Sequence, residues 1–203
     1  MSELIIWTYD WVPKGPRGFV REEAALPYTV RTVPFDGREI NHLAHQPFGQ
    51  VPFLSDGELQ IFESGAGVLH LARKTDELMP RDPVGEAHTL QWAIAALNSI
   101  EMVSVPWWFL KMSGKEDNGL AGWMGLRLQQ LERVLSEREW LVTNRFTAAD
   151  LLMADVLRVS EVRSFGDRPA TEAHVTRATN RPAFKKAYAD QMAHFEAADA
   201  QRA

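Results

Sequence analysis

Residues 46–64 read QPFGQVPFLSDGELQIFES, and this stretch indicates a loop, a strand, a tight turn, a second strand and a helix start. Residues 51–54 form a short apolar run, and the Asp-Gly pair at 56–57 is a strong signal for a two-residue hairpin turn. Residues 59–62 are the returning strand. Ser64 then occupies the position that we predict to be the N-cap of the following helix.

Pro52, Glu63 and Ser64 are the residues of this stretch that suggest a ligand. A proline that enters a strand removes a hydrogen-bond donor, so it is tolerated mainly at an edge, at a strand start or in the cis form. An edge opened in this way can pair with an extended peptide. Ser64 and the first amides of its helix form an anion site suited to a carboxylate, and Glu63 can accept from an ammonium group. Taken singly, these residues also fit an ordinary hairpin with a serine cap and a solvated glutamate.

Taken in order, the same residues resemble the glutathione-binding half of the glutathione transferases, whose N-terminal domain has the thioredoxin fold; the matching positions are Pro47, Gly49, Val51, Pro52, Glu63 and Ser64. The resemblance implies a cis peptide bond before Pro52 and backbone pairing between Val51 and the cysteinyl part of glutathione. It also implies that Glu63 and Ser64 hold the γ-glutamyl end. Gln50 resembles the family position that contacts the glycine carboxylate.

Composition places the chain among globular proteins of one large or two small domains. It has 203 residues, of which 45% are hydrophobic, enough to build a sizeable core. The net charge of -5, with acidic and basic residues interspersed, argues against a nucleic-acid surface. The N-terminus has no signal-peptide pattern, and no apolar run nears the roughly 18 residues of a membrane span. We therefore expect a cytoplasmic protein that binds neither nucleic acid nor membrane.

The chain contains no cysteine. Disulfides, cysteine-based metal sites and mechanisms in which the protein supplies the thiol are therefore excluded. Within the family that the chain resembles, this argues against the cysteine-dependent members that reduce mixed disulfides. Any thiol chemistry must come from a bound substrate, and glutathione would supply it as a co-substrate.

The N-terminal residues follow the strand, helix, strand order of a thioredoxin-like domain. Residues 4–9 (LIIWTY) are rich in β-branched and aromatic residues, which is typical of a buried strand. The proline- and glycine-bearing residues 10–18 indicate a loop, followed by a helix at about 19–26 and a strand near 28–33. This helix is shorter than the one that the family usually has between its first two strands.

The family places the residue that activates the thiol at the end of the first strand or the start of the first helix. Lowering a thiol pKa from about 8.5 by about two units takes about 2.7 kcal/mol of preferential thiolate stabilisation, much of which one charge-assisted hydrogen bond supplies. By analogy with the tyrosine-type members, Tyr9 is the best donor, followed by Thr8, with Arg17 as a positive charge. The loop contains no serine, and Tyr9 also fits a packed strand aromatic with its hydroxyl at the surface.

His42 and His45 have the spacing of a metal-binding pair on a helix, but no third ligand is near in the sequence. We interpret them as surface histidines of a short helix before Pro47. We therefore expect no metal site.

A polar, proline-bearing segment divides the chain into two parts. We assign residues 1–76 to a thioredoxin-like, glutathione-binding domain, residues 77–82 to a linker and residues 83–203 to an all-helical domain. Asp82 caps the first helix of the second part, and a proline occupies the first position of that helix. The helix is expected to kink or end near Pro106.

Phe146, Thr147 and Asp150 mark another helix start. Thr147 caps with Asp150 three residues on, and Phe146 can pack on Leu151 as a hydrophobic staple. The helix behind them, to about residue 162, is apolar on most sides and is therefore expected at the centre of its domain. This pattern resembles the family's capping motif, which makes Asp150 a folding residue rather than a catalytic acid.

Trp107, Trp108 and Met112 belong to a concentration of large apolar side chains. In the family the second substrate lies between the first-strand loop and this helical region. The resemblance therefore implies an acceptor pocket for a small apolar electrophile, with Trp11 facing it. Aromatic residues at helical spacing equally fit a core or a dimer interface.

Together these observations predict an α/β thioredoxin-like domain followed by an all-α helical domain. The resemblance implies a homodimeric glutathione transferase that serves in detoxification. Two other functions fit the same fold. One is a non-catalytic, transferase-like binding or assembly module, and the other is a glutathione-dependent peroxidase or reductase that differs only in its acceptor.

Overall fold

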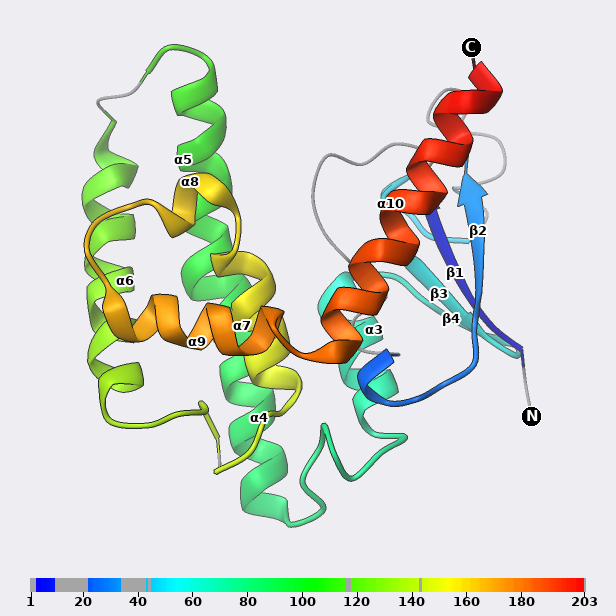
Figure 1. Cartoon of the computed structure of the whole chain (residues 1–203), viewed down its shortest axis with the longest axis horizontal. Helices are drawn as coiled ribbons and strands as arrows, with labels where there is room; N and C mark the ends of the chain where they lie inside the picture. Colours follow the sequence, from blue (N-terminus) through cyan, green and yellow to red (C-terminus); the bar gives the residue numbers. More distant parts are fainter. Residues whose placement is uncertain are drawn as a thin grey trace. The chain divides into compact units, whose positions relative to one another are not determined.

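The chain forms two compact units, Met1–Thr75 with Pro182–Ala203, and Asp76–Arg181. The first contains a small mixed sheet and the second is helical, so the predicted fold class is confirmed (Figure 1). The structure is a computed structural model, and it describes residues 3–9, 22–33, 43, 45–115, 118–142 and 144–202.

The sheet of the first unit has four strands in the order β2-β1-β3-β4 (Figure 1). The strands are β1 (Leu4–Tyr9), β2 (Thr29–Val33), β3 (Phe53–Asp56) and β4 (Leu59–Ile61). β1 and β2 run parallel, whereas β3 is antiparallel to both β1 and β4. Parallel strands need a crossover connection, and its residues 22–23 are helical, as the predicted strand, helix, strand order requires.

Side-chain alternation explains how the strands build the core. In β1, Leu4, Ile6 and Thr8 are buried, and the two residues between them are half-buried, because successive side chains point to opposite faces of the sheet. The β3–β4 hairpin turns at Gly57, whose φ of 64° is a left-handed conformation that favours glycine. The predicted hairpin is therefore confirmed, with β4 ending at Ile61.

The last helix, α10 (Pro182–Arg202), belongs to the first unit. The Lys186 ammonium donates to the Glu22 carboxylate at 2.8 Å, and a His194 ring nitrogen lies 3.2 Å from the Thr32 hydroxyl of β2. The division predicted from the sequence placed α10 in the helical domain, whereas the compact units place it with the sheet. A helix that follows other helices along the chain carries no local sign of the element on which it packs.

A continuous helical run opens the second unit, from α4 (Pro83–Ala95) through the π-helical η1 (Ala96–Glu101) to α5 (Met102–Met112). Of the two expectations for Pro106, a kink or an end, the end is wrong, because α5 continues beyond that proline. Burial of one face of α5 offsets the single backbone hydrogen bond that an internal proline loses.

This run, Pro83–Met112, is the one helix of the described residues that is long and apolar enough to cross a membrane, judged by length and composition alone. Glu86 and Glu101 confine its longest stretch without Asp, Glu, Lys or Arg to residues 87–100, so the sequence has no uncharged run long enough for a span. A single helix that meets this test is weak support for a membrane protein, since core helices of soluble proteins also meet it.

Helix α7 (Ala148–Leu157) is the centre of the helical unit, as its apolar sequence predicts. All its residues except Asp155 are buried, and it packs against α4, η1 and α9 (Pro169–Thr179) (Figure 1). Thr147 and Asp150 form the predicted capping box at its start. The remaining helices of this unit are α6 (Gly119–Ser136) and α8 (Ser160–Arg163).

The predicted linker, residues 77–82, packs with the helical unit. Leu78 is 1% exposed, and its carbonyl accepts a hydrogen bond from the Ala148 amide at 3.0 Å. Asp82 caps α4 as predicted, because its Oδ1 accepts from the Gly85 amide at 2.7 Å. This segment is thus the beginning of the second unit rather than a free connection.

Candidate functional site

A buried glutamine holds the loop before β3 in shape. Gln46 is 4% exposed; its Nε2 donates to the Gln50 carbonyl at 2.8 Å, and its Oε1 accepts from the Phe48 amide at 2.9 Å. Gly49 lies between these two partners with a φ of 61°, which favours glycine. Sequence reasoning missed the role of Gln46, because a polar residue beside a proline carries no sign of burial.

The Val51–Pro52 peptide bond is cis, as predicted. Val51 packs against the small buried cluster of Val33 and Phe53. Within the described residues the ladder of β3 begins at Phe53, so the backbone of Val51 lies just before the sheet hydrogen bonds start. An extended peptide can add to a sheet at such a strand entrance.

Helix α3 (Ser64–Ala72) begins one residue earlier than predicted, with Glu63 at the N-cap position. Glu63 has φ of 68° and ψ of 119°, and a positive φ is uncommon for a residue with a side chain. The N-cap prediction for Ser64 is therefore wrong, because the change of backbone direction occurs at Glu63 and Ser64 is already helical.

Glu63 and Ser64 are both exposed, and no side-chain hydrogen bond caps α3. Among the described residues, neither the Glu63 side chain nor the Ser64 side chain has a hydrogen-bond or ion-pair partner. The first amides of a helix attract a carboxylate, and the Glu63 carboxylate beside them attracts an ammonium group. This arrangement suits the two charges of an amino-acid end group.

β1 ends beside the cis-proline. Trp7 and Phe53 are partners in the antiparallel pairing of β1 and β3. One further step of this register sets Thr8 beside Pro52. Thr8 is 6% exposed, and its Oγ1 has no hydrogen-bond partner among the described residues. Two predicted features far apart in the sequence, the strand end for thiol activation and the strand entrance for backbone pairing, are therefore neighbours.

The other thiol-activating candidates are less well defined. Tyr9 is the last residue of β1, but its side chain lies outside the described residues. Arg17 lies wholly outside them, as does Trp11, which was predicted for the acceptor pocket. Their predicted roles stay predictions.

His45 stacks with Trp7 and Phe53, at ring-centroid distances of 6.1 and 5.7 Å. Its Nδ1 lies 2.8 Å from Oε1 of Gln60. His45 is exposed, as the interpretation of a surface histidine expects, and its ring packs against β1 and β3; His42 lies outside the described residues. Across the described ranges, no group of three His, Cys, Asp or Glu side chains is placed to hold a metal ion.

Trp107 lies in the core of the helical unit. It is 5% exposed, it meets Phe165 edge to face at 5.4 Å, and the Lys111 ammonium lies 5.3 Å from its ring centroid. Trp107 is therefore a core residue, which is one of the interpretations that its helical spacing allowed. Trp108 is half-buried and Met112 is 69% exposed. Their spacing of four residues puts them on one side of α5, and their place in an acceptor pocket stays a prediction.

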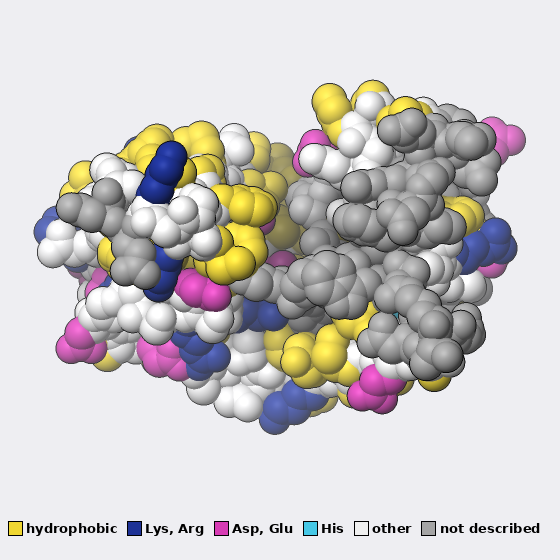
Figure 2. Space-filling model, turned by 90° about the horizontal axis from the view of Figure 1, so that it is seen from above, with side chains coloured by type: hydrophobic (Ala, Val, Ile, Leu, Met, Phe, Trp, Pro, Cys, Tyr) yellow, Lys and Arg dark blue, Asp and Glu magenta, His cyan; other side chains and the backbone are white. Residues whose placement is uncertain are grey.

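Large apolar side chains are exposed on α4, α5 and α6. Figure 2 shows hydrophobic side chains, in yellow, on the face of the helical unit seen there. Exposed apolar patches on a folded protein are typical of contact with another molecule. The exposed residues of these helices are Val84, Ile94, Met102, Val105, Phe109, Met112, Trp123 and Leu126.

Asp150 is a structural carboxylate, in agreement with its predicted folding role. Its Oδ2 accepts from the Thr147 amide and hydroxyl at 2.9 and 3.0 Å, and its Oδ1 accepts from the Leu141 amide at 2.8 Å. Burial raises the pKa of Asp150 to about 6 against the effect of these hydrogen bonds. The Nε2 of His174 lies 3.9 Å from Asp150 Oδ1. Burial disfavours the charged form of this imidazole and lowers its pKa to about 4.

Both units match models of one protein family. Residues 4–73 match the model described as glutathione S-transferase, N-terminal domain, and residues 122–182 match glutathione S-transferase, C-terminal domain. The chain is 30% identical over 165 residues to glutathione S-transferase F11 of Arabidopsis thaliana, covering 71% of this chain and 76% of that protein. It is 30% identical over 183 residues to glutathione S-transferase 1 of Schizosaccharomyces pombe, covering 74% and 73%.

A solved structure has the same fold. It is the theta class glutathione S-transferase from Xanthomonas axonopodis pv. citri with glutathione bound, with a TM-score of 0.77 and 23% identity over 92% of this chain and 97% of that chain. An identity at this level supports the fold alone. The domain models and the relatives together establish that the chain belongs to the glutathione S-transferase family.

Proposed function

We propose that this glutathione S-transferase binds glutathione across the entrance of β3 and the start of α3 and adds its thiol to a small apolar electrophile. The pairing of Trp7 with Phe53 supports this proposal most strongly. It sets the end of β1, where a thiol activator is expected, beside the Val51 backbone that is expected to pair with the cysteinyl residue.

The two ends of glutathione have matching partners in this proposal. The first amides of α3 with Ser64 receive the γ-glutamyl carboxylate, an interaction of about 0.3–1 kcal/mol at an exposed helix N-terminus. Glu63 accepts from the ammonium group, and Gln50 meets the glycine carboxylate. Val51 pairs with the middle of the peptide as an added strand would.

Thiol activation takes place at the end of β1. Tyr9, Thr8 or Arg17 stabilises the thiolate, and the unpartnered Thr8 hydroxyl is the candidate that the described residues support. A stabilisation of about 2.7 kcal/mol lowers the thiol pKa by about two units, which makes the thiolate dominant at neutral pH. The thiol proton passes to solvent.

The reaction is a direct attack on the electrophile. The thiolate sulfur forms a bond to an electrophilic carbon, and the displaced electron pair leaves with the departing group or moves into the conjugated acceptor. The resemblance implies that Trp11, Trp108 and Met112 line the acceptor side; Trp108 is half-buried and Met112 is 69% exposed, and their large apolar side chains suit an apolar electrophile. The protein positions the reactants and forms no covalent intermediate of its own.

We also propose that the protein is a homodimer that works in the cytoplasm in detoxification. The exposed apolar side chains of α4, α5 and α6 support self-association, since burying them in a symmetric contact removes apolar surface from water.

A non-catalytic glutathione-binding module is the second candidate. The burial of Thr8 favours it, because a hydroxyl that is 6% exposed meets a sulfur atom only if neighbouring groups move aside. A peroxidase or reductase activity uses the same glutathione site and differs in the acceptor.

The test is a titration of the purified protein with glutathione, followed by tryptophan fluorescence and checked by calorimetry. We expect saturable binding, weakened several-fold by Ser64→Ala and by Glu63→Gln. Ser136→Ala, an exposed serine of the helical unit, is the matched control and leaves the affinity unchanged. No binding at millimolar glutathione overturns the proposal. Binding with no shift in thiol pKa, in wild type as in Thr8→Val and Tyr9→Phe, favours the binding module.

A further inference from the structure

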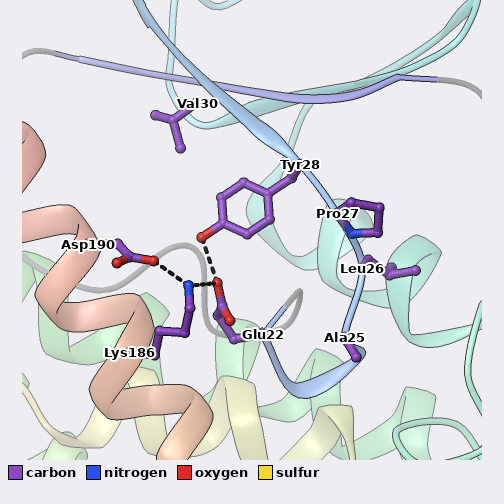
Figure 3. Close-up of a pocket in the computed structure, with 8 residues that line it drawn as sticks. All are labelled: Glu22, Ala25, Leu26, Pro27, Tyr28, Val30, Lys186 and Asp190. Atoms are coloured by element: carbon purple, nitrogen blue, oxygen red, sulfur yellow. Dashed lines mark hydrogen bonds and ion pairs between the residues drawn. The ribbon is translucent and has the colours of Figure 1, made fainter.

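The first unit has a hollow of about 650 Å³ between α10 and the segment that leads into β2 (Figure 3). Its walls combine an ion-pair group with small and apolar side chains. The lining residues are Glu22, Ala25, Leu26, Pro27, Tyr28, Val30, Lys186 and Asp190.

One carboxylate oxygen joins the two sides of this hollow. Oε1 of Glu22 accepts from the Lys186 ammonium at 2.8 Å and from the Tyr28 hydroxyl at 2.8 Å (Figure 3). Lys186 also donates to Oδ2 of Asp190, one turn along α10, at 2.7 Å. The hydrogen bonds to Asp190 and Glu22 raise the pKa of Lys186, which stays protonated. The two carboxylates of this group share the one ammonium, which makes the group a connection between elements rather than a ligand site.

Glu22 is the protected member of this group. The Glu22 side chain is 14% exposed, whereas the Lys186 side chain is 59% exposed. The Glu22 carboxylate is largely shielded from water and also accepts from the Tyr28 hydroxyl. Its ion pair with Lys186 is therefore stronger than the average exposed pair, because water competes less for the carboxylate.

A second contact joins α10 to the other end of β2. A ring nitrogen of His194 lies 3.2 Å from the Thr32 hydroxyl. Thr32 is the register partner of Thr8, and Val33 is the partner of Tyr9, in the parallel pairing of β1 and β2. α10 therefore contacts the segment before β2 and the part of β2 that flanks the proposed thiol-activating end of β1.

β2 depends on such contacts because little of it is buried. It is the edge strand of the sheet, and four of its five residues are exposed, with only Val33 buried. An edge strand with one buried side chain has little apolar burial to fix its position, so polar connections to a neighbouring helix weigh more.

We infer that Glu22 and Lys186 are positioning residues for the transferase reaction: by joining α10 to the start of β2 they hold β2, and through its register β1, so that the thiol activator faces the sulfur of glutathione. The inference depends on the proposed function. It requires neither residue to touch glutathione, and it predicts an effect on thiol activation rather than on glutathione affinity.

The test compares wild type with Lys186→Met and Glu22→Gln. The thiol pKa of bound glutathione is measured from the thiolate absorbance against pH, together with the glutathione affinity and the thermal unfolding midpoint. We expect each variant to raise the thiol pKa by about half a unit, equivalent to about a threefold change in the thiol–thiolate equilibrium. The glutathione affinity should stay within about twofold, and Lys186→Arg should restore most of the wild-type thiol pKa.

Asp190→Asn is the matched control, because Asp190 pairs with Lys186 within α10 and does not contact β2 in this group. It should leave the thiol pKa unchanged. An unchanged thiol pKa in both Lys186→Met and Glu22→Gln overturns the inference. A loss of glutathione affinity or of folded protein in both variants also overturns it, since that result assigns a general structural role. If wild type itself binds no glutathione, the proposed function fails, and that outcome is seen before any variant is compared.

Discussion

Replacing Gln46 by methionine should weaken glutathione binding although Gln46 lies outside the predicted contact residues. The side chain is nearly the same size, so the substitution removes polarity with little change in volume. It eliminates the hydrogen bond to the Gln50 carbonyl at 2.8 Å and the one from the Phe48 amide at 2.9 Å. These two bonds fix the loop that leads into the Val51–Pro52 bond.

The expected magnitude follows from these two bonds. Each contributes about 0.5–1.5 kcal/mol net, so the closed loop loses about 2 kcal/mol. If the closed loop outweighs the open loop by about three- to fifteenfold in wild type, such a loss, a factor of about 30, leaves it closed for about a tenth to a third of the time. Because the apparent dissociation constant scales inversely with the competent fraction, it should rise about three- to tenfold.

Calorimetric titration with glutathione measures this effect, and thermal unfolding shows how much the fold itself is destabilised. Gln130→Met makes the same chemical change at an exposed position of α6 in the other unit and is the control. If Gln46→Met binds glutathione as wild type does while its unfolding midpoint falls, the loop does not form the site and the reasoning is refuted.

Three further predictions concern stability. His174→Leu removes a buried ring whose nitrogens have no hydrogen-bond partner among the described residues and whose pKa falls to about 4. The variant keeps Asp150, whose pKa is about 6. A raised carboxyl pKa gives stability that is full below about 3.8 and lost as pH rises through about 6, so urea unfolding should show the variant gaining about 1 kcal/mol from about pH 7 to about pH 5. Wild type should change less, because the lowered His174 pKa has the opposite sign. Glu63→Gly removes a side chain from a positive φ and should keep or raise the unfolding midpoint while glutathione binding weakens; a lower midpoint contradicts the strain argument. Gly85→Ala would bring a Cβ within 2.6 Å of neighbouring atoms and should cost about 1–3 kcal/mol, whereas Gly122→Ala meets nothing within 4 Å and should stabilise α6 by about 0.5–1 kcal/mol; calorimetric unfolding of the pair checks both signs.

Features decided by a few adjacent residues could be predicted from the sequence. The hairpin at Gly57 depends on a turn that glycine favours, and the capping box of Thr147 and Asp150 depends on spacing along one helix turn. The cis bond before Pro52 came from the resemblance, which carried a property of the family to a matching residue.

Predictions that needed distant contacts were less complete. Trp107 fitted a pocket or a core equally well from its spacing, and only its contact with Phe165 shows the core. The N-cap of α3 is Glu63 rather than Ser64, because the positive φ of Glu63 turns the chain there. The composition of the segment gives no sign of this φ value. The burial of Gln46 depends on neighbours that fold over it.

The sequence by itself determined the strands, the starts of α4 and α7 and the family, because these depend on local propensity and on a short ordered motif. Only the tertiary structure decided that the end of β1 lies beside Pro52 and that α10 packs with the first unit. The first is set by the register between β1 and β3. The second involves contacts between residues as far apart in the sequence as Glu22 and Lys186. Such contacts arise when the chain closes on itself, and no local segment of the sequence contains both partners.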